Sequence, residues 1–429
     1  MSPVSKKRKR PGPRRPTRQH APASIVDAML AAFSERLDDD GPLQSELMVS
    51  GLLGMAWGGS EWGRTEAAEA LALEVINTNP TRHPAGGLLL SLIAGVGPES
   101  LRERARGLRD AGVASGMANW RIPDWVDSIG MTSLDGSAIV TDVYGDQTSY
   151  YLEFSYPGAD QSEPHVLVVL VDYNLHLVKD MFVRVGPGIL EFLAALGDED
   201  DGTTLAEMDP QLASDDIWHH LWITDRTIGE PFGEESAETR YFAAARLAAL
   251  PSPRPDAIDV PEIPEAERDR IVAAFMKTVA VKDLLSGEGT PDAPPERDCV
   301  RFIARVAVDY ACDYGTGDPL HWSPTAVELF LTDWAPRKVN WEAEDVLWVP
   351  EVLDALVAYS GRRTGLGRRW IEETRAAVDE YGGDFLALEL EGTSNGPATQ
   401  IVASMPSDSV DVTDELAVQR WVNRHNASL

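Results

Sequence analysis

Four short runs of β-branched and aromatic residues between positions 136 and 186 constrain the fold of this chain more than any other feature of its sequence. The first two runs, in SAIVTDVYGDQTSYYLEFSY, flank Gly145 and Asp146, which are typical residues of a tight turn. The second two, in HVLVVLVDYNLHLVKDMFVRV, flank a similar turn at positions 173–174. Residues 166–171 are apolar on both faces, as expected for a central strand. The pattern predicts a four-stranded antiparallel β-meander.

Helical spacing of apolar residues is found on both sides of this meander. It covers the chain from about residue 24 to 115 and again after Gly186, and it predicts an α+β fold that is mostly helical. We expect an N-terminal helical region, the embedded four-stranded meander and a C-terminal helical region. Residues 384–391, DFLALELE, look like an isolated strand. The helices expected in the C-terminal region lie near 264–278, 296–314, 323–335, 350–360, 366–381 and 413–425.

The distribution of prolines and apolar residues predicts the domain boundaries. Residues 1–23 contain few apolar side chains and are expected to form a disordered basic tail. Residues 24–250 are expected to form a helical domain that contains the meander, at about 136–186. Five prolines within residues 251–264 indicate a linker. Residues 265–429 would then form a mainly helical C-terminal domain.

The charges of the chain are unevenly distributed. The sequence has 38 bases and 69 acids, a net charge of −31, yet its first 20 residues contain eight bases and no acid. The other 409 residues therefore have 30 bases and 69 acids, a balance of −39. A body this acidic repels nucleic acid, whereas the tail attracts it. Non-specific contact with nucleic acid, with another polyanion or with the protein's own acidic surface is therefore expected of Lys6, Lys7, Arg8, Lys9, Arg10, Arg14, Arg15 and Arg18.

The two cysteines indicate a reducing compartment. Cys299 and Cys312 fall on one predicted helix, about 20 Å apart along its axis, and cannot form a disulfide with each other there. No run approaches the ~20 apolar residues of a membrane span. Polar residues also interrupt the apolar stretch that a signal peptide would need after the basic start. The expected location is the cytoplasm, without a membrane partner.

The stretch ASDDIWHHLWITDRT concentrates acids, histidines and tryptophans. If Ser214 caps a helix, Asp215 and His219 lie together at the border of its apolar face, and Asp216 and His220 face water. The adjacent histidines then point about 100° apart and cannot bind one ion from a regular helix. The favoured interpretation is a capped amphipathic helix, and a metal site at Asp215 and His219 is the alternative.

GTSNG, residues 392–396, matches the G-x-S-x-G pattern of a hydrolase nucleophile elbow. It follows a predicted strand, so Ser394 as a nucleophile with His425 as its base is the catalytic alternative. Only 33 residues follow the motif, too few for the further parallel strands and crossover helices of such a fold. A simple turn is the favoured interpretation.

GRRTGLGRRW, residues 361–370, combines three glycines with four arginines. Arginine makes paired hydrogen bonds to phosphate and carboxylate groups, so the segment is a candidate anion site. The residues before it have helical spacing, and its glycines do not match a dinucleotide-binding loop. A turn between two helices is therefore favoured, and the candidate anion-binding residues are Arg362, Arg363, Arg368 and Arg369.

The predicted helix at 296–314 carries a basic ridge beside its apolar stripe. Arg297, Arg301 and Arg305 recur every fourth residue and lead to Asp309. Such a ridge in an acidic protein either receives an anionic partner or pairs internally. The residues expected in the buried stripe are Cys299, Phe302, Ile303, Val306 and Tyr310. The polar residues around the end of this helix, which match no metal-binding motif, are Asp309, Asp313, Asp318 and His321.

The sequence lacks a C-x-x-C pair, an EF-hand loop and a Walker A loop. We therefore expect no cofactor. The favoured function is that of a cytoplasmic interaction or regulatory protein, tethered to nucleic acid or another polyanion by its basic tail, with an unidentified protein partner. The alternative is an enzyme, either a hydrolase using Ser394 or a metal-dependent enzyme using Asp215 and His219.

Overall fold

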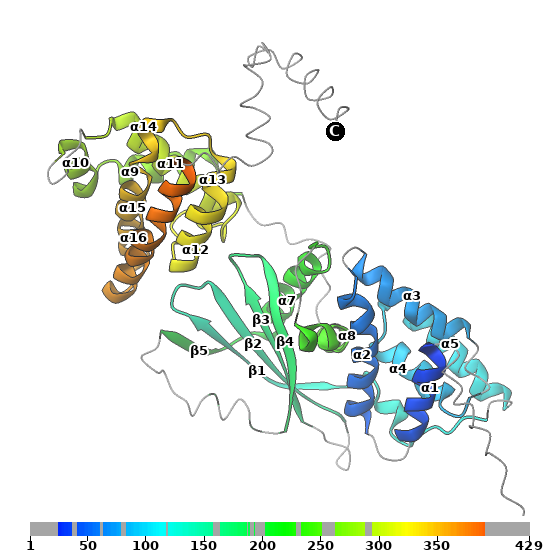
Figure 1. Cartoon of the computed structure of the whole chain (residues 1–429). Helices are drawn as coiled ribbons and strands as arrows, with labels where there is room; N and C mark the ends of the chain where they lie inside the picture. Colours follow the sequence, from blue (N-terminus) through cyan, green and yellow to red (C-terminus); the bar gives the residue numbers. More distant parts are fainter. Residues whose placement is uncertain are drawn as a thin grey trace, which may run out of the picture. The chain divides into compact units, whose positions relative to one another are not determined.

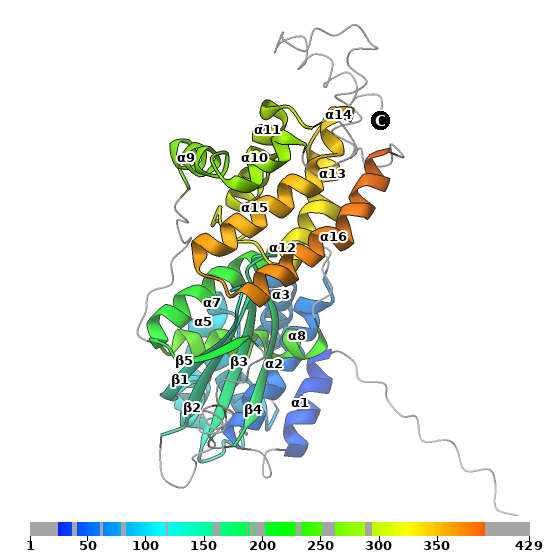
Figure 2. The same ribbon diagram turned by 90° about the vertical axis from the view of Figure 1, so that its left-hand side faces the viewer.

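Figures 1 and 2 show the chain as a computed structural model. The structure describes residues 25–36, 41–60, 63–78, 83–116, 119–157, 164–186, 188, 193, 202–228, 233–250, 262–287 and 294–390. The chain divides into two compact units: unit 1 comprises Met1–Met131 and Arg240–Ala245, and unit 2 comprises Thr132–Thr239 and Arg246–Leu429. Helices dominate, and one antiparallel sheet lies among them, which confirms the predicted mostly helical α+β class.

Unit 1 is built around helix α4 (Gly86–Val96). The sequence of α4, GGLLLSLIAGV, is apolar on every side, and nearly all of its residues are buried, as expected for a central helix. It packs against α1, α2 and α5. The helices around it, blue to cyan in Figure 1, are α1 (Ile25–Arg36), α2 (Pro42–Gly58), α3 (Arg64–Asn77) and α5 (Glu99–Ser115), and a 3₁₀ turn, η2, follows at Val126–Ser128.

The indole ring of Trp120 packs directly on two glycines of unit 1. A Cβ atom built on Gly87 of α4 would lie 2.8 Å from the ring, and one on Gly112 of α5 would lie 2.1 Å from it. Both distances are shorter than any packed carbon–carbon contact. The ring can therefore lie against both helices only because these two positions carry no side chain.

Unit 2 contains a five-stranded antiparallel sheet in the order β4-β3-β2-β1-β5. Its strands are β1 (Ser133–Asp142), β2 (Gln147–Ser155), β3 (His165–Asp172), β4 (Leu177–Val185) and β5 (Thr203–Glu207). The first four form the predicted meander, and β3 is an interior strand, buried on both faces as predicted. The prediction missed β5, which pairs with β1 at the edge of the sheet. Its sequence, TTLAE, is short and mostly exposed, so it lacks the apolar alternation of a half-buried strand.

The two hairpin turns of the meander lie at the same end of the sheet, and an acidic side chain fixes each of them. The Asp142 carboxylate accepts hydrogen bonds from the backbone N–H groups of Tyr144 and Gly145, at 2.8 and 3.0 Å. Gly145 adopts φ 79°, a left-handed conformation that favours glycine. In the second turn, the Asp172 carboxylate accepts a hydrogen bond from the backbone N–H of Asn174 at 3.1 Å.

Helix α7 (Pro210–Thr224) packs on strands β3 and β4. It begins before the predicted cap at Ser214, because Asp209 caps it by accepting a hydrogen bond from the backbone N–H of Gln211. Its buried face includes His220, which is 4% exposed. The expectation that Asp216 and His220 face water is therefore wrong. The hydroxyls of Tyr150 and Tyr173 donate to Asp216, and His220 Nδ1 bonds to the backbone carbonyl of Asp216 within the helix, so the apolar pattern alone did not identify the packed face.

The remaining elements of unit 2 are helical. The cap predicted at Ser323 is confirmed, because its hydroxyl accepts a hydrogen bond from the backbone N–H of Ala326 at 3.0 Å. The helices are α8 (Glu234–Ala248), whose middle part belongs to unit 1, α9 (Glu265–Phe275), α10 (Val279–Ser286), α11 (Arg297–Asp313), α12 (Pro324–Glu328), α13 (Ala335–Lys338), α14 (Ala343–Val346), α15 (Val349–Thr364) and α16 (Arg368–Leu390).

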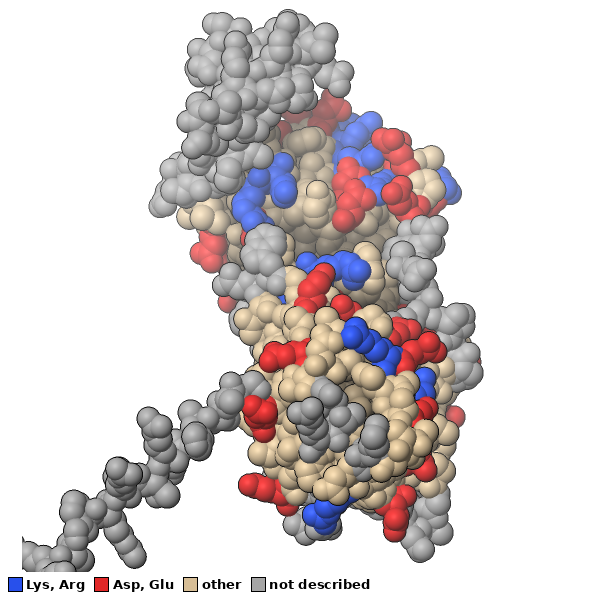
Figure 3. All heavy atoms as spheres, turned by 90° about the vertical axis from the view of Figure 1, so that its right-hand side faces the viewer, with Lys and Arg blue, Asp and Glu red and all other residues tan. Residues whose placement is uncertain are grey.

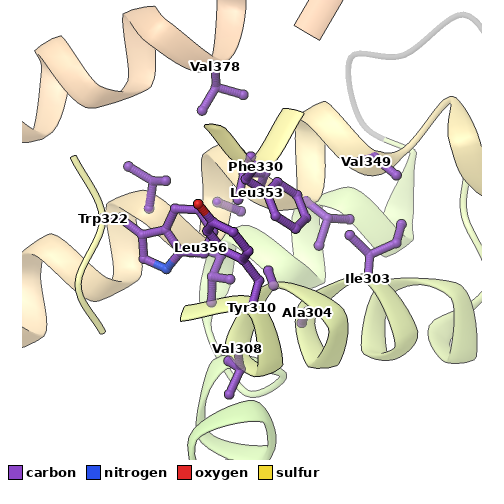
Figure 4. Packing of buried hydrophobic residues seen from close by; sticks show 14 of the residues in the cluster. Ile303, Ala304, Val308, Tyr310, Trp322, Phe330, Val349, Leu353, Leu356 and Val378 are labelled. Carbon is purple, nitrogen blue, oxygen red and sulfur yellow. The ribbon is translucent and has the colours of Figure 1, made fainter. Parts of the chain in front are cut away.

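A π-helical segment, η3 (Leu329–Trp334), joins α12 to α13. Such a segment accommodates one extra residue within a helix. The rings of Phe330 and Trp334 stack with their centroids 5.8 Å apart, and both contact the ring of Tyr310 from α11. Figure 4 shows Tyr310 and Phe330 in the apolar core of these helices, close to Trp322.

Two sequence predictions in the C-terminal helices were wrong. Residues 384–391 were predicted as a strand, but their described part is the end of α16, because Leu, Ala and Glu favour helix and Phe385 packs in the core. Gly382 does not end this helix; a Cβ there would lie 3.1 Å from Pro350, so the glycine allows α15 and α16 to approach. Phe302 was expected in the buried stripe of α11, yet its side chain is 41% exposed.

Two expectations about the chain as a whole can be compared with the described residues. Cys299 and Cys312 both lie on α11, as predicted, and both are free. None of the helices that the structure describes combines the length and the apolar character that a membrane crossing requires. The domain boundaries inferred from the prolines stay a prediction.

Candidate functional site

Asp146 and His321 form a hydrogen-bonded pair in unit 2, although they lie far apart in the sequence. His321 Nε2 lies 2.8 Å from Asp146 Oδ1, and the two side chains are only 14% and 10% exposed. Asp146 ends the turn between β1 and β2, and His321 lies in the loop between α11 and α12. A carboxylate only accepts hydrogen bonds, so His321 donates from Nε2, and its Nδ1 is an acceptor in the neutral imidazole.

The surroundings of Asp146 keep its carboxyl group ionised. Burial by itself would raise its pKa, but hydrogen bonds from His321 and Ser323 and the charge of His321 outweigh this effect. The pKa of Asp146 therefore lies below its ordinary value of 3.8. An ionised carboxylate at this position fixes both the tautomer and the orientation of the imidazole at neutral pH.

A pocket of about 360 Å³ opens beside this pair. Three segments of unit 2 line it: the β1–β2 turn, the loop before α12 and the glycine-rich turn between α15 and α16. In the glycine-rich segment, the chain reverses direction at Gly365, which adopts φ 81° and ends α15. The residues that line the pocket include Tyr144, Asp318, His321, Thr364, Gly365 and Gly367.

Tyr144 holds the β1–β2 turn against the start of α16. Its hydroxyl donates a hydrogen bond to the backbone carbonyl of Trp370 at 3.1 Å, and the two rings meet edge to face with centroids 6.0 Å apart. Burial raises the pKa of Tyr144 to about 12, so the phenol stays protonated and keeps this hydrogen bond at neutral pH. The wall of the pocket is thus fixed by a side chain that also lines it.

The lining of the pocket includes one carboxylate, that of Asp318, and no lysine or arginine. Asp318 is exposed, and its carboxylate orients the loop by accepting a hydrogen bond from the backbone N–H of Leu320 at 2.8 Å. The C-terminal end of α15 and the N-terminal end of α16 both border the pocket, and their opposite partial charges offset each other. The carboxylate of Asp318 therefore leaves the lining with a negative charge, which complements a ligand that donates hydrogen bonds.

The glycine- and arginine-rich segment predicted from the sequence lines this pocket with its glycines rather than with its arginines. Arg368 forms an ion pair with Glu372, at 2.7 Å, and the guanidinium of Arg369 lies over the ring of Trp370, 4.3 Å from its centroid. Arg362 lines a different pocket, of about 540 Å³. The structure therefore does not bring the candidate anion-binding arginines together around one cavity.

The two acids of the histidine-rich helix α7 have different surroundings. Asp216 accepts hydrogen bonds from the hydroxyls of Tyr150 and Tyr173, at 2.5 and 2.9 Å, and its backbone carbonyl accepts one from His220 Nδ1 at 2.9 Å. Burial and the charge of Asp216 raise the pKa of Tyr173 to about 12. Both phenols therefore remain donors at neutral pH, and this network fastens α7 to the sheet.

Asp215 and His219, the predicted alternative metal ligands, lie beside this network. Asp215 accepts a hydrogen bond from the side-chain amide of Gln211 at 3.2 Å, and the ring of His219 meets the ring of His220 edge to face. Burial and the nearby charge of His220 lower the pKa of His219. Across the described ranges, no group of three or more His, Cys, Asp and Glu side chains is placed to hold a metal ion.

The remaining predicted site residues, Ser394, His425 and the bases of the N-terminal tail, lie outside the described residues. Sequence reasoning noted Asp146 only as a turn residue and His321 only as part of a polar loop. No spacing pattern connects two residues that are 175 positions apart, so their hydrogen bond was not predictable from the sequence.

Comparisons with known proteins assign neither the pocket nor the chain to a family. No protein-family model matches the sequence, and neither the curated proteins nor the solved structures contain a match to it. The function proposed below therefore rests on the chemistry of the pocket and on the charge distribution of the chain.

Proposed function

We propose that this chain is a binding protein with two separate means of recognition. The pocket beside Asp146 and His321 takes a small ligand that carries ammonium or hydroxyl donors. The basic N-terminal tail tethers the protein to nucleic acid or another polyanion, in the cytoplasm. The observation that carries the first part is the carboxylate of Asp318 in a lining without lysine or arginine, and the uneven charge distribution supports the second.

The composition of the pocket supports ligand binding. Its volume of about 360 Å³ falls within the range of small-molecule sites. Asp318 is charged, and the Asp146–His321 pair is held in one geometry by its hydrogen bond, so these acceptors are already oriented before a ligand arrives. Among the described residues, no serine or cysteine lines the pocket. The hydroxyl of Thr364, which does line it, donates hydrogen bonds to backbone carbonyls of α15. This arrangement favours recognition of a donor-bearing ligand.

Titration calorimetry with 1,4-diaminobutane, sorbitol and butyrate tests the class of ligand. We expect the diamine to bind most tightly and butyrate not to bind, because the lining offers a carboxylate and no lysine or arginine. Replacing Asp318 by Asn keeps an oxygen for the backbone bond but removes the charge, and should weaken diamine binding about tenfold. Asp283→Asn, at an exposed acid of the other pocket, is the matched control. Equal affinities of the Asp318→Asn variant and the wild type for the diamine would contradict the proposal.

The uneven charge distribution supports a tether. Eight bases and no acid in the first 20 residues provide up to eight phosphate contacts, while the rest of the chain carries a balance of −39. On the face of the molecule shown in Figure 3, acidic and basic side chains lie among one another rather than in one large basic area. The tail is therefore the part of this chain best suited to a polyanion.

Deletion of residues 1–20 should abolish salt-dependent retention on immobilised duplex DNA and on heparin. In the full chain, affinity should fall steeply between 50 and 200 mM salt, by about two orders of magnitude or more, because counterions are released on binding. A variant with Arg362, Arg363, Arg368 and Arg369 changed to Gln controls for bases of the folded part and should be retained like the wild type. Undiminished retention of the deleted chain would exclude the tether.

The enzymatic alternative predicts a different outcome. A hydrolase that uses Ser394 would be labelled by a broad ester probe, and the Ser394→Ala variant would not be. Labelling of this kind would replace the binding proposal by a catalytic one.

A further inference from the structure

A third pocket of unit 2, far from Asp146 along the chain, has the opposite chemistry. It lies between helices α9 and α11 and has a volume of about 700 Å³. Its floor is apolar and includes the buried side chains of Val272 and Met276. At its edge, the ring of Phe302 is 41% exposed and meets the ring of Trp341 edge to face. The floor itself is almost closed to solvent, with Val272 5% and Met276 4% exposed, so Phe302 is the large apolar side chain of this lining that water reaches.

Bases outnumber acids around this floor. The lining contains four bases and two acids, a balance of +2 in a chain with a net charge of −31. Three of these bases, Lys277, Arg297 and Arg301, are exposed, and their side chains form no hydrogen bond or ion pair with another residue that the structure describes. In such an acidic protein, a cluster of bases without acidic partners is unexpected if its role is only structural.

Two other arginines of helices α9 and α11, Arg268 and Arg305, do form ion pairs. Arg305 binds Asp309 at 2.8 Å and Asp269 at 2.6 Å, and Arg268 binds Asp309 and Asp313. The basic ridge predicted on α11 therefore pairs internally at its C-terminal end and stays unpaired at its N-terminal end. Arg297 is the first residue of α11, where the helix dipole disfavours a positive charge. Stability of the helix thus does not explain why this residue is basic.

We propose that this pocket binds an amphipathic anion, a medium-chain fatty acid, with its alkyl chain on the floor and its carboxylate between Arg297 and Arg301. The alkyl chain contacts Val272 and Met276 and covers the exposed ring of Phe302, and the charge of the carboxylate is matched by two guanidinium groups that form no other ion pair. The volume of the pocket lies in the range of small-molecule sites rather than that of a folded partner. The lining of this pocket is basic and that of the pocket beside Asp146 is acidic, so the ligands of these two pockets do not compete.

Titration calorimetry with dodecanoate on the full chain tests this proposal. We expect saturable binding of one dodecanoate per chain, and no comparable binding of dodecyltrimethylammonium, which has the same alkyl chain and the opposite charge. The double variant Arg297→Gln, Arg301→Gln should weaken dodecanoate binding at least tenfold. The matched control is Arg362→Gln, Arg363→Gln, which removes the same charge from the last turn of α15 and should change nothing.

Substitutions of Phe302 separate the apolar contribution from the charge. Phe302→Ser should weaken binding of dodecanoate several-fold, whereas Phe302→Leu should restore most of it. All five changed positions, the four arginines and Phe302, are exposed, so the thermal unfolding midpoints of the variants should match that of the wild type. The proposal is overturned if the Arg297→Gln, Arg301→Gln variant binds dodecanoate as the wild type does, or if the cationic surfactant binds equally well.

Discussion

Replacing Arg246 by alanine should destabilise unit 2 by about 4 kcal/mol. The side chain of Arg246 is 0% exposed, and its Nε and Nη2 atoms donate to His165 Nε2, at 3.0 Å, and to the hydroxyl of Tyr156, at 2.7 Å. Its guanidinium also lies 5.4 Å from the centroid of the Tyr156 ring. The substitution leaves a large cavity and removes a partner from each of two buried polar groups, and each of these effects is destabilising.

Urea unfolding followed by circular dichroism measures this change in the free energy of unfolding. Arg184→Ala is a suitable control, because Arg184 is an exposed arginine of the same sheet and its loss should cost less than about 0.5 kcal/mol. Arg246→Met retains most of the volume and should recover part of the loss. A result for Arg246→Ala close to that of the control would show that the buried hydrogen bonds contribute little to stability.

Two glycine-to-alanine substitutions on helix α5 should change the stability of unit 1 in opposite directions. Gly112→Ala should destabilise it by about 2 kcal/mol, because the new methyl group would overlap the ring of Trp120. Gly107→Ala should stabilise it by about 0.5–1 kcal/mol, since no atom lies within 4 Å of a Cβ there and alanine is the better helix former.

The pair is informative because both positions lie in one helix and receive the same chemical change. Thermal unfolding of the two variants, read by tryptophan fluorescence and circular dichroism, distinguishes the signs. Stabilisation by both substitutions would mean that Trp120 moves away from α5 without cost. The ring would then not need a glycine at position 112.

The sequence contained enough local information to predict the meander and most helices. Turn residues such as Gly145 and Asn174 separate runs with the apolar pattern of strands, and Ser323 followed by a proline marks a helix start. The wrong strand at 384–391 shows the limit of such patterns. Its residues 385–388 form a short apolar run that suits a buried strand, but a helix of good helix formers that packs Phe385 into the core has the lower free energy.

The candidate sites were less predictable because they depend on contacts between distant segments. The orientation of α7 was wrong in the prediction because hydrogen bonds from Tyr150 and Tyr173 to Asp216, and not apolar area alone, hold this helix against the sheet. The hydrogen bond between Asp146 and His321 leaves no trace in local spacing. The exposure of Phe302 likewise depends on which side of α11 its neighbours cover. Part of the basic ridge could be foreseen, but not which of its arginines would find acidic partners.

The packing around the π-helical segment η3 depends on the number of residues in this segment. Phe330 and Trp334 stack within this widened turn, against Tyr310. Loss of one residue between them would restore the ordinary helical pitch, but it would rotate every following side chain by about 100°. Deletion of one residue here would therefore break the aromatic contacts without removing any aromatic residue. The number of residues in η3 is thus as strict a requirement as their identity.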